Sequence, residues 1–594
     1  MDRPLPVRLP FFLLFASCVF GLASCGGGGG GGGGGPSPPP PPVGNITLSG
    51  RITFDRPTRT ASHTHNFSVT QRLPARGVAV EVLRSSDLAV LATVPADANG
   101  NYVANFASTR FIVRARAQLL RASPGSYDFE VRDNTANGAL YVLDAAAVTP
   151  TSNTMAVDLN AGTGWDGVRF SGTRAAAVFA ILDVAWQAQD LVHQAEASLD
   201  MRALDFFWSS ANRAEDPVGA CAGQPDPVTG QIGTSFFLAI SFPASGGCPA
   251  IPAGIYVLGD ASGDLNDDPD EFDNSVIAHE FGHYYEFFFS RSDSMGGPHG
   301  LSSLLDFRVA MGEGWGNAFQ GFVHNDSFYR DTFSASGAFG FFFDMDRRSA
   351  PFAFDRAVDY SSEACVAEIL WDLFDPAGTP DVVVDNVGLG FGPLHAVMRN
   401  EVANTPAMTG IWVPVSALRN RFPAQVADIN VFLNDCQVTG SDEFALGETG
   451  PGGDPFAVPV YRSVTFGVAF NVTSINRFAD AGDTYYRSYN RQGARRYLRI
   501  VLPAAGGMTV TAQGPVGSDP DFFLYRIGVD QCPTGGACDG TNDSVATGRE
   551  DATFANLPAG TYTLEVFECS NLGEQCRPGP PLGDTTIQMT VTQP

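Results

Sequence analysis

The chain has 594 residues, a formal net charge of −27 and a hydrophobic fraction of 44%. This length predicts several domains, and a charge this negative repels phosphate backbones, so nucleic acid is not an expected partner. All 36 basic residues are arginines, which excludes lysine nucleophiles and Schiff-base chemistry.

Residues 1–25 have the pattern of an export signal, because two arginines precede an apolar run that is too short to span a membrane. The end of this signal, L-A-S-C at 22–25, resembles a bacterial lipobox, in which the signal is removed just ahead of the cysteine and the cysteine is acylated. Ordinary cleavage without a lipid is the alternative. The Gly/Pro linker at 26–44 combines a flexible tether with a stiff spacer. We therefore expect a lipid anchor on Cys25 and an outer-membrane or surface location in a Gram-negative bacterium.

Residues 45–160 are expected to be all-β. Three runs alternate or are rich in β-branched residues: 46–54, 78–83 and 111–115. The turn at 97–102 (D-A-N-G-N-Y) separates two strands. This segment resembles the small transthyretin-like sandwiches that are appended to secreted peptidases. His63 and His65 form an H-x-H pair that can bind metal, but a solvated loop is the favoured interpretation.

Residues 165–440 have a mixed pattern. A helical apolar period covers 174–199, and strand-like runs follow it. We expect the last run, Ile255 to Leu258, to be the edge along which an extended peptide binds. The loop at 260–273 is dense in carboxylates and has no basic residue. A Ca²⁺ site and a solvated acidic loop explain it equally well.

The central motif of the chain is His279-Glu280-x-x-His283. An apolar stripe predicts a helix here, with its N-cap at Asp273 or Asn274. On that helix the two histidines lie one turn apart on the same face, so both imidazoles can hold one Zn²⁺. Glu280 lies beside them and is placed as the general base for a metal-activated water.

A zinc enzyme needs a third protein ligand. The best candidate is Glu313, within the G-E-G-W segment at 312–315, and His299 in the preceding loop is a rival. Asn317 lies one turn beyond Glu313 on the same face. Its side chain is placed to orient a metal ligand through a hydrogen bond.

With these motifs the chain resembles the gluzincin metallopeptidases of the thermolysin-like clan, and within them the fungalysin-type branch, in which H-E-x-x-H is followed by G-E-G-W. The resemblance covers about residues 165–440. It implies a catalytic glutamate at Glu280 and the zinc ligands His279, His283 and Glu313. The family usually has aspartate where this chain has Asn317. A neutral amide orients a histidine less strongly, which puts the rate of the reaction in doubt.

Two further residues are candidates for the donor that stabilises a developing oxyanion. Tyr360 stands at the start of an expected capped helix at 360–374 and is the nearest match to a histidine of the fungalysin-type proteins. His395 is the second candidate. A buried or capping role is the alternative for Tyr360, and the sequence leaves the choice open.

Residues 455–594 alternate with a period of two and are expected to be all-β. Two segments, at 519–525 and 557–562, resemble the pre-peptidase C-terminal sandwich of secreted bacterial peptidases, an accessory module.

Eight cysteines lie outside the export signal, an even number that suits disulfides in an oxidising compartment. Proximity groups them, without fixing the connectivity, as Cys221/Cys248, Cys532/Cys538 and Cys569/Cys576, which leaves Cys365/Cys436 as the remaining pair.

The predicted fold is therefore multidomain, with an α+β gluzincin-like catalytic domain flanked by N-terminal and C-terminal all-β sandwich domains. We expect a monomeric zinc endopeptidase that acts on peptide or protein substrates. The alternative is a non-catalytic surface lipoprotein that uses the metal fold as a binding or adhesion scaffold. The intact Glu280 favours the enzyme, because a scaffold does not need the base.

Overall fold

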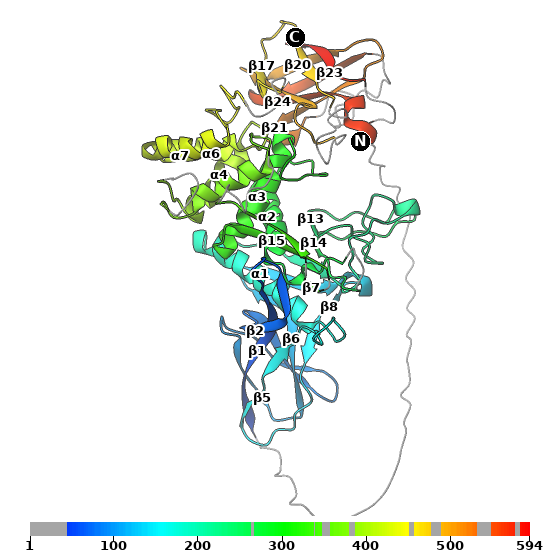
Figure 1. Cartoon of the computed structure of the whole chain (residues 1–594), viewed down its shortest axis with the longest axis vertical. Coiled ribbons are helices and arrows are strands. Elements are labelled where there is room, and N and C mark those ends of the chain that lie inside the picture. Colours follow the sequence, from blue (N-terminus) through cyan, green and yellow to red (C-terminus); the bar gives the residue numbers. More distant parts are fainter. Residues whose placement is uncertain are drawn as a thin grey trace, which may run out of the picture.

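The computed structural model describes residues 44–262, 267–334, 336–337, 339–346, 357–378, 386–450, 457–476, 489–531, 548–576 and 582–593. The expected export signal, the anchor at Cys25, nearly all of the linker and the Cys532/Cys538 pair lie outside these residues. The described chain is multidomain and mixes α and β structure. It is elongated, with β-sheets at both ends and most of the helices between them (Figure 1).

The N-terminal end is built around one long strand, β1 (Asn45–Arg59). It pairs with four shorter strands: β2 (His65–Pro74), β5 (Asn101–Ala107), β10 (Thr154–Ala156) and β11 (Leu159–Ala161). Along β5 the side chains are alternately buried and exposed. The alternation expected for a half-buried strand therefore places one face of this sheet on the core.

A second sheet crosses the domain boundary that the sequence predicts near residue 160. Its order is β13-β14-β12-β7-β6-β3-β4, and β8 (Ala139–Leu140) and β9 (Val142–Asp144) pair at its side. The main strands are β3 (Val78–Arg84), β4 (Val90–Pro95), β6 (Phe111–Arg121), β7 (Tyr127–Asp133), β12 (Leu204–Trp208), β13 (Phe236–Leu238) and β14 (Gly254–Val257). Strand β7 runs parallel to β12, with Phe129 opposite Leu204. The N-terminal β region and the region before the metal motif therefore share one sheet.

The expected peptide-binding edge is also different. Strand β14 pairs with β12 on one side, where Ile255 lies opposite Phe206. On its other side it pairs with β13 in the antiparallel sense, where Tyr256 lies opposite Phe236. The terminal strand at this end of the described sheet is thus β13 and not Ile255 to Leu258. The chain that precedes β14 folds back as β13 and covers the edge of β14.

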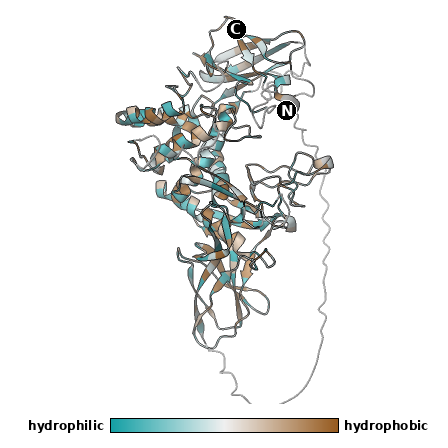
Figure 2. Cartoon of the chain, viewed as in Figure 1, coloured by the Kyte–Doolittle hydropathy of each residue, from teal (hydrophilic) through white to brown (hydrophobic). Residues whose placement is uncertain are grey.

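The helices pack between the two ends of the molecule. The principal ones are α1 (Ala175–Ala195), α2 (Asn274–Phe289), α3 (Phe307–His324), α4 (Glu363–Phe374), α5 (Phe391–Val397), α6 (Trp412–Arg421) and α7 (Val426–Asp435). Helix α1 is long and apolar enough to cross a membrane by length and composition, but 72% of its apolar window is buried in the protein. Hydrophobic and hydrophilic residues are interspersed along the elements, as expected for elements with one buried face (Figure 2).

The C-terminal part of the chain is a β-sandwich, as predicted. One sheet has the order β17-β19-β24-β21-β22 and the other β18-β25-β20-β23. The strands are β17 (Tyr461–Ser463), β18 (Phe470–Ser474), β19 (Arg495–Leu502), β20 (Gly506–Gln513), β21 (Pro520–Arg526), β22 (Val529–Asp530), β23 (Arg549–Leu557), β24 (Gly560–Glu568) and β25 (Thr585–Thr592). Their inward side chains form a core separate from that of the rest of the chain.

Three of the four expected disulfides lie within the described residues, and all three are confirmed: Cys221–Cys248, Cys365–Cys436 and Cys569–Cys576.

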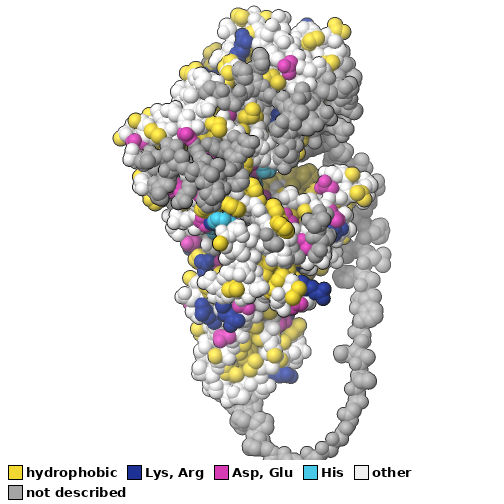
Figure 3. All heavy atoms as spheres, viewed as in Figure 1, with side chains coloured by type: hydrophobic (Ala, Val, Ile, Leu, Met, Phe, Trp, Pro, Cys, Tyr) yellow, Lys and Arg dark blue, Asp and Glu magenta, His cyan; other side chains and the backbone are white. Residues whose placement is uncertain are grey.

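Acidic and basic side chains are both spread over the face of the molecule seen in Figure 3. The negative net charge is therefore not gathered into one patch on that face.

Candidate active site

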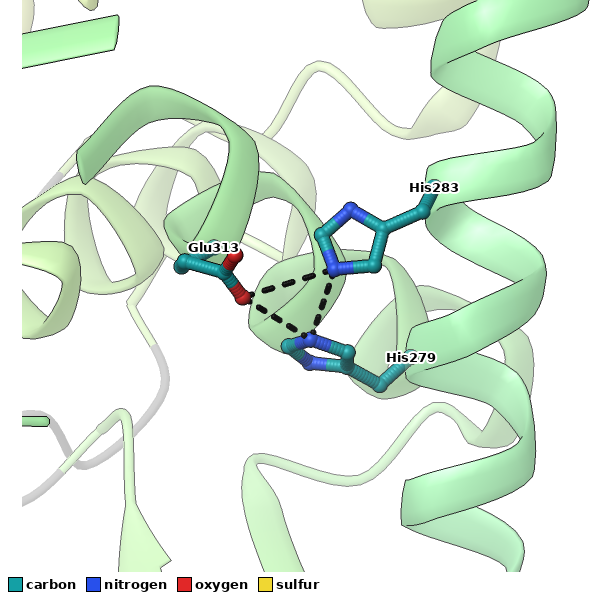
Figure 4. A group of neighbouring side chains, drawn as sticks. All are labelled: His279, His283 and Glu313. Carbon is teal, nitrogen blue, oxygen red and sulfur yellow. Dashed lines mark hydrogen bonds and ion pairs between the residues drawn. The ribbon is translucent and has the colours of Figure 1, made fainter. Parts of the chain in front are cut away.

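Three side chains from two helices converge on one point. His279 and His283 project from α2, and Glu313 projects from α3 toward them (Figure 4). His279 Nε2 lies 3.0 Å from His283 Nε2 and 3.3 Å from Glu313 Oε2, and His283 Nε2 lies 3.4 Å from the same oxygen. Tetrahedral ligands at about 2.0–2.1 Å from zinc are about 3.3–3.4 Å apart. The three donor atoms therefore fit one zinc ion and leave a fourth position.

A hydrogen bond on the side of the ring away from the other ligands fixes the orientation of His279. Its Nδ1–H donates to the Asn317 side-chain oxygen over 3.0 Å, which leaves Nε2 free to face the other two ligands. The residue before Asn317 is Gly316, where an added Cβ would lie only 2.7–2.9 Å from three atoms of the His279 ring. The two helices can come this close only because glycine stands at that position, as the G-E-G-W-G sequence permits.

The buried side chains of Glu313 and His283 strongly influence each other's pKa. Burial opposes the ionisation of Glu313, but the imidazoles of His299 and His283 outweigh it and hold the pKa of Glu313 well below its usual range. Burial likewise opposes the charge on His283, yet Glu313 raises the pKa of His283 to about 9. Each group stabilises the charge of its neighbour.

Glu280 lies beside these ligands and lines the same cavity of about 640 Å³. Its side chain is buried, and burial raises the pKa of Glu280 while His279 and His283 act in the opposite sense. The residues just before and within β13, at 234–237, line the cavity on one side. The catalytic carboxylate predicted from the motif therefore faces the same space as the free edge of the sheet.

His299 enters this cavity from the loop before α3. Its Nδ1–H donates to Glu363 over 2.7 Å, and its Nε2 lies 3.5 Å from the Glu313 carboxylate. Burial opposes the charge on this ring, but Glu313 and Glu363 raise the pKa of His299 to about 10. His299 contributes no donor atom to the point where His279, His283 and Glu313 converge, so it is better placed as a hydrogen-bond donor in the cavity than as the third metal ligand.

Tyr329 is a cavity residue that the sequence did not indicate. It lies on β15 (Phe328–Phe333), which forms a hairpin with β16 (Phe339–Asp344). Its ring meets the His279 ring edge-on, with centroids 6.1 Å apart. No motif marks this tyrosine; only its place in an aromatic strand could have drawn attention to it.

The structure does not bring the two expected oxyanion donors to the cavity. Tyr360 is 2% exposed and its ring packs against Trp412 with centroids 4.9 Å apart, beside a different and much smaller cavity. His395 accepts from the Tyr285 hydroxyl over 2.8 Å and donates to Glu196 over 3.0 Å. Both side chains are occupied in packing between helices, as the alternative for Tyr360 foresaw.

The H-x-H pair of the N-terminal region is not in a solvated loop. His65 is 2% exposed, and its Nε2 lies 3.0 Å from the carboxylate of Asp273, the N-cap residue of α2. His63 stacks on Phe328 of the hairpin with centroids 4.7 Å apart. The expectation of a solvated loop was wrong, because the N-terminal sheet packs directly on the elements that line the cavity.

No family model and no curated protein matches the chain. Weak structural neighbours include the pre-peptidase C-terminal domain of a collagenase from Bacillus anthracis, with 12% identity over 22% of this chain and 94% of that chain and a TM-score of 0.15. Another is CorA, a surface-associated copper-binding protein of Methylomicrobium album BG8, with 10% identity over 23% of this chain and 98% of that chain and a TM-score of 0.16. Likenesses this weak carry no argument, so function is inferred from the site.

Proposed function

We propose that the protein is a zinc-dependent endopeptidase with a gluzincin-like catalytic domain. The observation that carries the proposal is the convergence of His279, His283 and Glu313 at zinc-ligand spacing, with Glu280 facing the same cavity. A metal-binding scaffold needs the three ligands alone. A carboxylate beside them in a cavity is what a hydrolase needs in addition.

When bound, a zinc ion at this point supplies Lewis-acid chemistry that acidifies a water molecule and polarises a carbonyl group. Glu280 accepts the proton from that water as its oxygen forms a bond to the scissile carbonyl carbon. The same carboxyl group then donates the proton to the amide nitrogen as the C–N bond breaks. One side chain thus serves as base and then as acid.

The substrate in this proposal is an extended peptide lying along β13. This strand is the terminal one of its sheet among the described residues and lines the cavity next to Glu280. A peptide added to a free strand edge gains backbone hydrogen bonds that do not depend on its sequence. This edge takes the place of the run Ile255 to Leu258, in which Ile255 and Tyr256 are already paired on both sides.

His299 and Tyr329 take the place of Tyr360 and His395 as the donors to the developing oxyanion. Both line the cavity, and the His299 ring is held by Glu363, so it needs little reorganisation during the reaction. An imidazole N–H and a phenol O–H are both suitable donors.

The scaffold alternative drew its support from Asn317, which stands where the related peptidases have aspartate. The Asn317 oxygen accepts from His279 Nδ1–H at 3.0 Å, so the hydrogen bond that orients the ligand is made. The alternative is left with only the weaker orientation that a neutral amide gives in place of a carboxylate. For the location we propose the outer membrane or cell surface, through a lipid on Cys25, in keeping with the L-A-S-C segment.

The test compares wild type with Glu280→Gln, which keeps size and shape and removes the base. We expect about one zinc per chain in both proteins. Activity on an unstructured protein substrate should fall at least about 10²–10⁴-fold in the variant. Equal cleavage rates with equal zinc content would mean that the peptidase assignment is wrong and that the scaffold function takes its place.

A further inference from the structure

A second group of acidic side chains lies in the same cavity, apart from the proposed zinc ligands. Asp268 and Asp270 precede α2, and Asp331 lies on β15. One carboxylate oxygen from each of the three lies within 4.8 Å of the others, and all three residues line the cavity. We refer to Asp268, Asp270 and Asp331 as the aspartate trio.

The trio contains buried oxygen atoms without a partner. Asp270 is 3% exposed, and one of its oxygens accepts from the Ser235 hydroxyl over 2.5 Å. Its other oxygen, Oδ1, is buried and has no hydrogen-bond partner, and the same holds for Oδ1 of Asp268 and of Asp331. No arginine forms an ion pair with the trio within the described parts of the chain. Burying unpaired carboxylates in this way is costly unless a cation compensates their charge.

We infer that the aspartate trio is a second metal site, which binds a hard divalent cation of the Ca²⁺ type. The protein donors are all carboxylate oxygens, without the nitrogen or sulfur donors that zinc prefers. Oxygen ligands at about 2.3–2.6 Å from Ca²⁺ are separated by no more than about 5.2 Å, which the spacing of the trio satisfies. Water from the cavity can supply the remaining ligands.

The charges of the trio agree with this assignment. Burial, together with the nearby Asp273, raises the pKa of Asp268 to about 7. Burial and the surrounding carboxylates raise the pKa of Asp270 and of Asp331 well above the usual range. The three groups therefore destabilise one another when they are ionised together, and a divalent cation would relieve that repulsion.

Such an ion would join two elements of the proposed active site. It would bind the segment before α2 to strand β15, two residues from Tyr329. Asp273 already connects the same elements, because its carboxylate accepts from the Thr332 N–H and hydroxyl, each at 3.2 Å. The cation would thus fix the hairpin that carries Tyr329 against the zinc helix. This inference does not depend on peptidase activity, since binding of the cation can be measured without a substrate.

The test uses the full chain carrying one equivalent of zinc and freed of calcium. Addition of Ca²⁺ should raise Tm by about several degrees, with a midpoint of roughly 10⁻⁴–10⁻³ M, as for extracellular calcium modules. Tb³⁺ should bind at the same site, and Ca²⁺ should displace it. In Asp331→Asn, and independently in Asp268→Asn, calcium affinity should fall at least about 10-fold, while Tm without calcium should stay the same or rise because repulsion is relieved.

The matched control is Asp326→Asn, which removes a charge at the start of the same hairpin from a residue that pairs with Arg330. It should respond to calcium as wild type does. The inference is overturned if wild type shows neither a Tm shift nor Tb³⁺ binding, or if Asp331→Asn responds like wild type. It is also overturned if calcium has no effect and Asp331→Asn instead loses cleavage beside Arg or Lys, because the trio would then be a substrate subsite. A calcium shift in a protein without peptidase activity would support the cation site and refute only the proposed function.

Discussion

The zinc affinity of the protein should depend on a glycine that touches no metal. In Gly316→Ala the new Cβ would lie 2.7 Å from His279 Cε1 and 2.8 Å from Nε2. Carbon atoms in contact are about 3.5–4.0 Å apart, so the ring would have to retreat by about 0.8 Å or more. The imidazole has little room to do so, because Asn317 holds its other nitrogen.

A shift of this size moves the ligand nitrogen away from the other two donors. Loss of a ligand's orienting contact typically lowers metal affinity about 10–100-fold, and we expect a loss in that range. Zinc affinity is measured by competition with a chromogenic chelator, and circular dichroism checks the fold. Helix propensity by itself would make alanine about 1 kcal/mol better than glycine, so a loss of affinity is not an effect of helix stability.

The matched control is Gly312→Ala, one turn earlier on α3. There an added Cβ would have Ser294 Cβ as its nearest neighbour, at 3.3 Å, and would not approach a metal ligand. Zinc affinity should then remain near that of wild type. If Gly316→Ala binds zinc as tightly as Gly312→Ala does, the close packing of α2 on α3 does not position His279, and the reasoning fails.

Three further predictions concern the cavity, the C-terminal sandwich and the anchor. His299→Ala should keep the zinc stoichiometry and lose about 10²–10³-fold in kcat, whereas the kcat of Tyr360→Phe should stay near that of wild type. A loss of zinc in His299→Ala would show instead that this residue is a ligand. Glu565→Ala should lower stability by about 3–5 kcal/mol, seen as a lower Tm, because it removes the carboxylate that pairs with the buried Arg495 and one of the two that pair with the buried Arg308; an unchanged Tm would contradict this. A Cys25→Ser protein should no longer enter the detergent phase in phase partitioning, and its continued entry would refute the anchor.

The sequence was sufficient for those features that depend on local patterns. The i,i+4 histidines and their apolar stripe predicted the helix that the structure shows at α2. Proximity correctly paired the cysteines of two described disulfides, Cys221–Cys248 and Cys569–Cys576, and left Cys365 and Cys436 as the third pair. The period-two alternation predicted the C-terminal sandwich. These patterns report which face of an element is buried, and that is set within a few residues of the chain.

The features that the sequence did not predict depend on pairing between distant segments. Whether a strand lies at the edge of a sheet depends on its partners. The partner of β14 is β13, and the sequence of β13 shows no distinctive alternation of apolar and polar residues. The donor to the oxyanion was sought at Tyr360 by its place relative to a motif. The cavity instead receives His299, which is held by Glu363, a residue 64 positions further along the chain. No local pattern records such a pairing.

The β regions at both ends of the chain contact elements of the cavity that lies between them. The Asn490 side chain donates to the backbone oxygens of Gly296 and Pro298, at 2.9 and 3.0 Å, in the loop that carries His299. The backbone of Leu305, at the start of α3, forms a β-bridge with Arg491. At the other end of the chain, His65 lies against the N-cap residue of the zinc helix. Because both ends of the chain contact elements that line the cavity, we expect both to position the groups of the proposed active site.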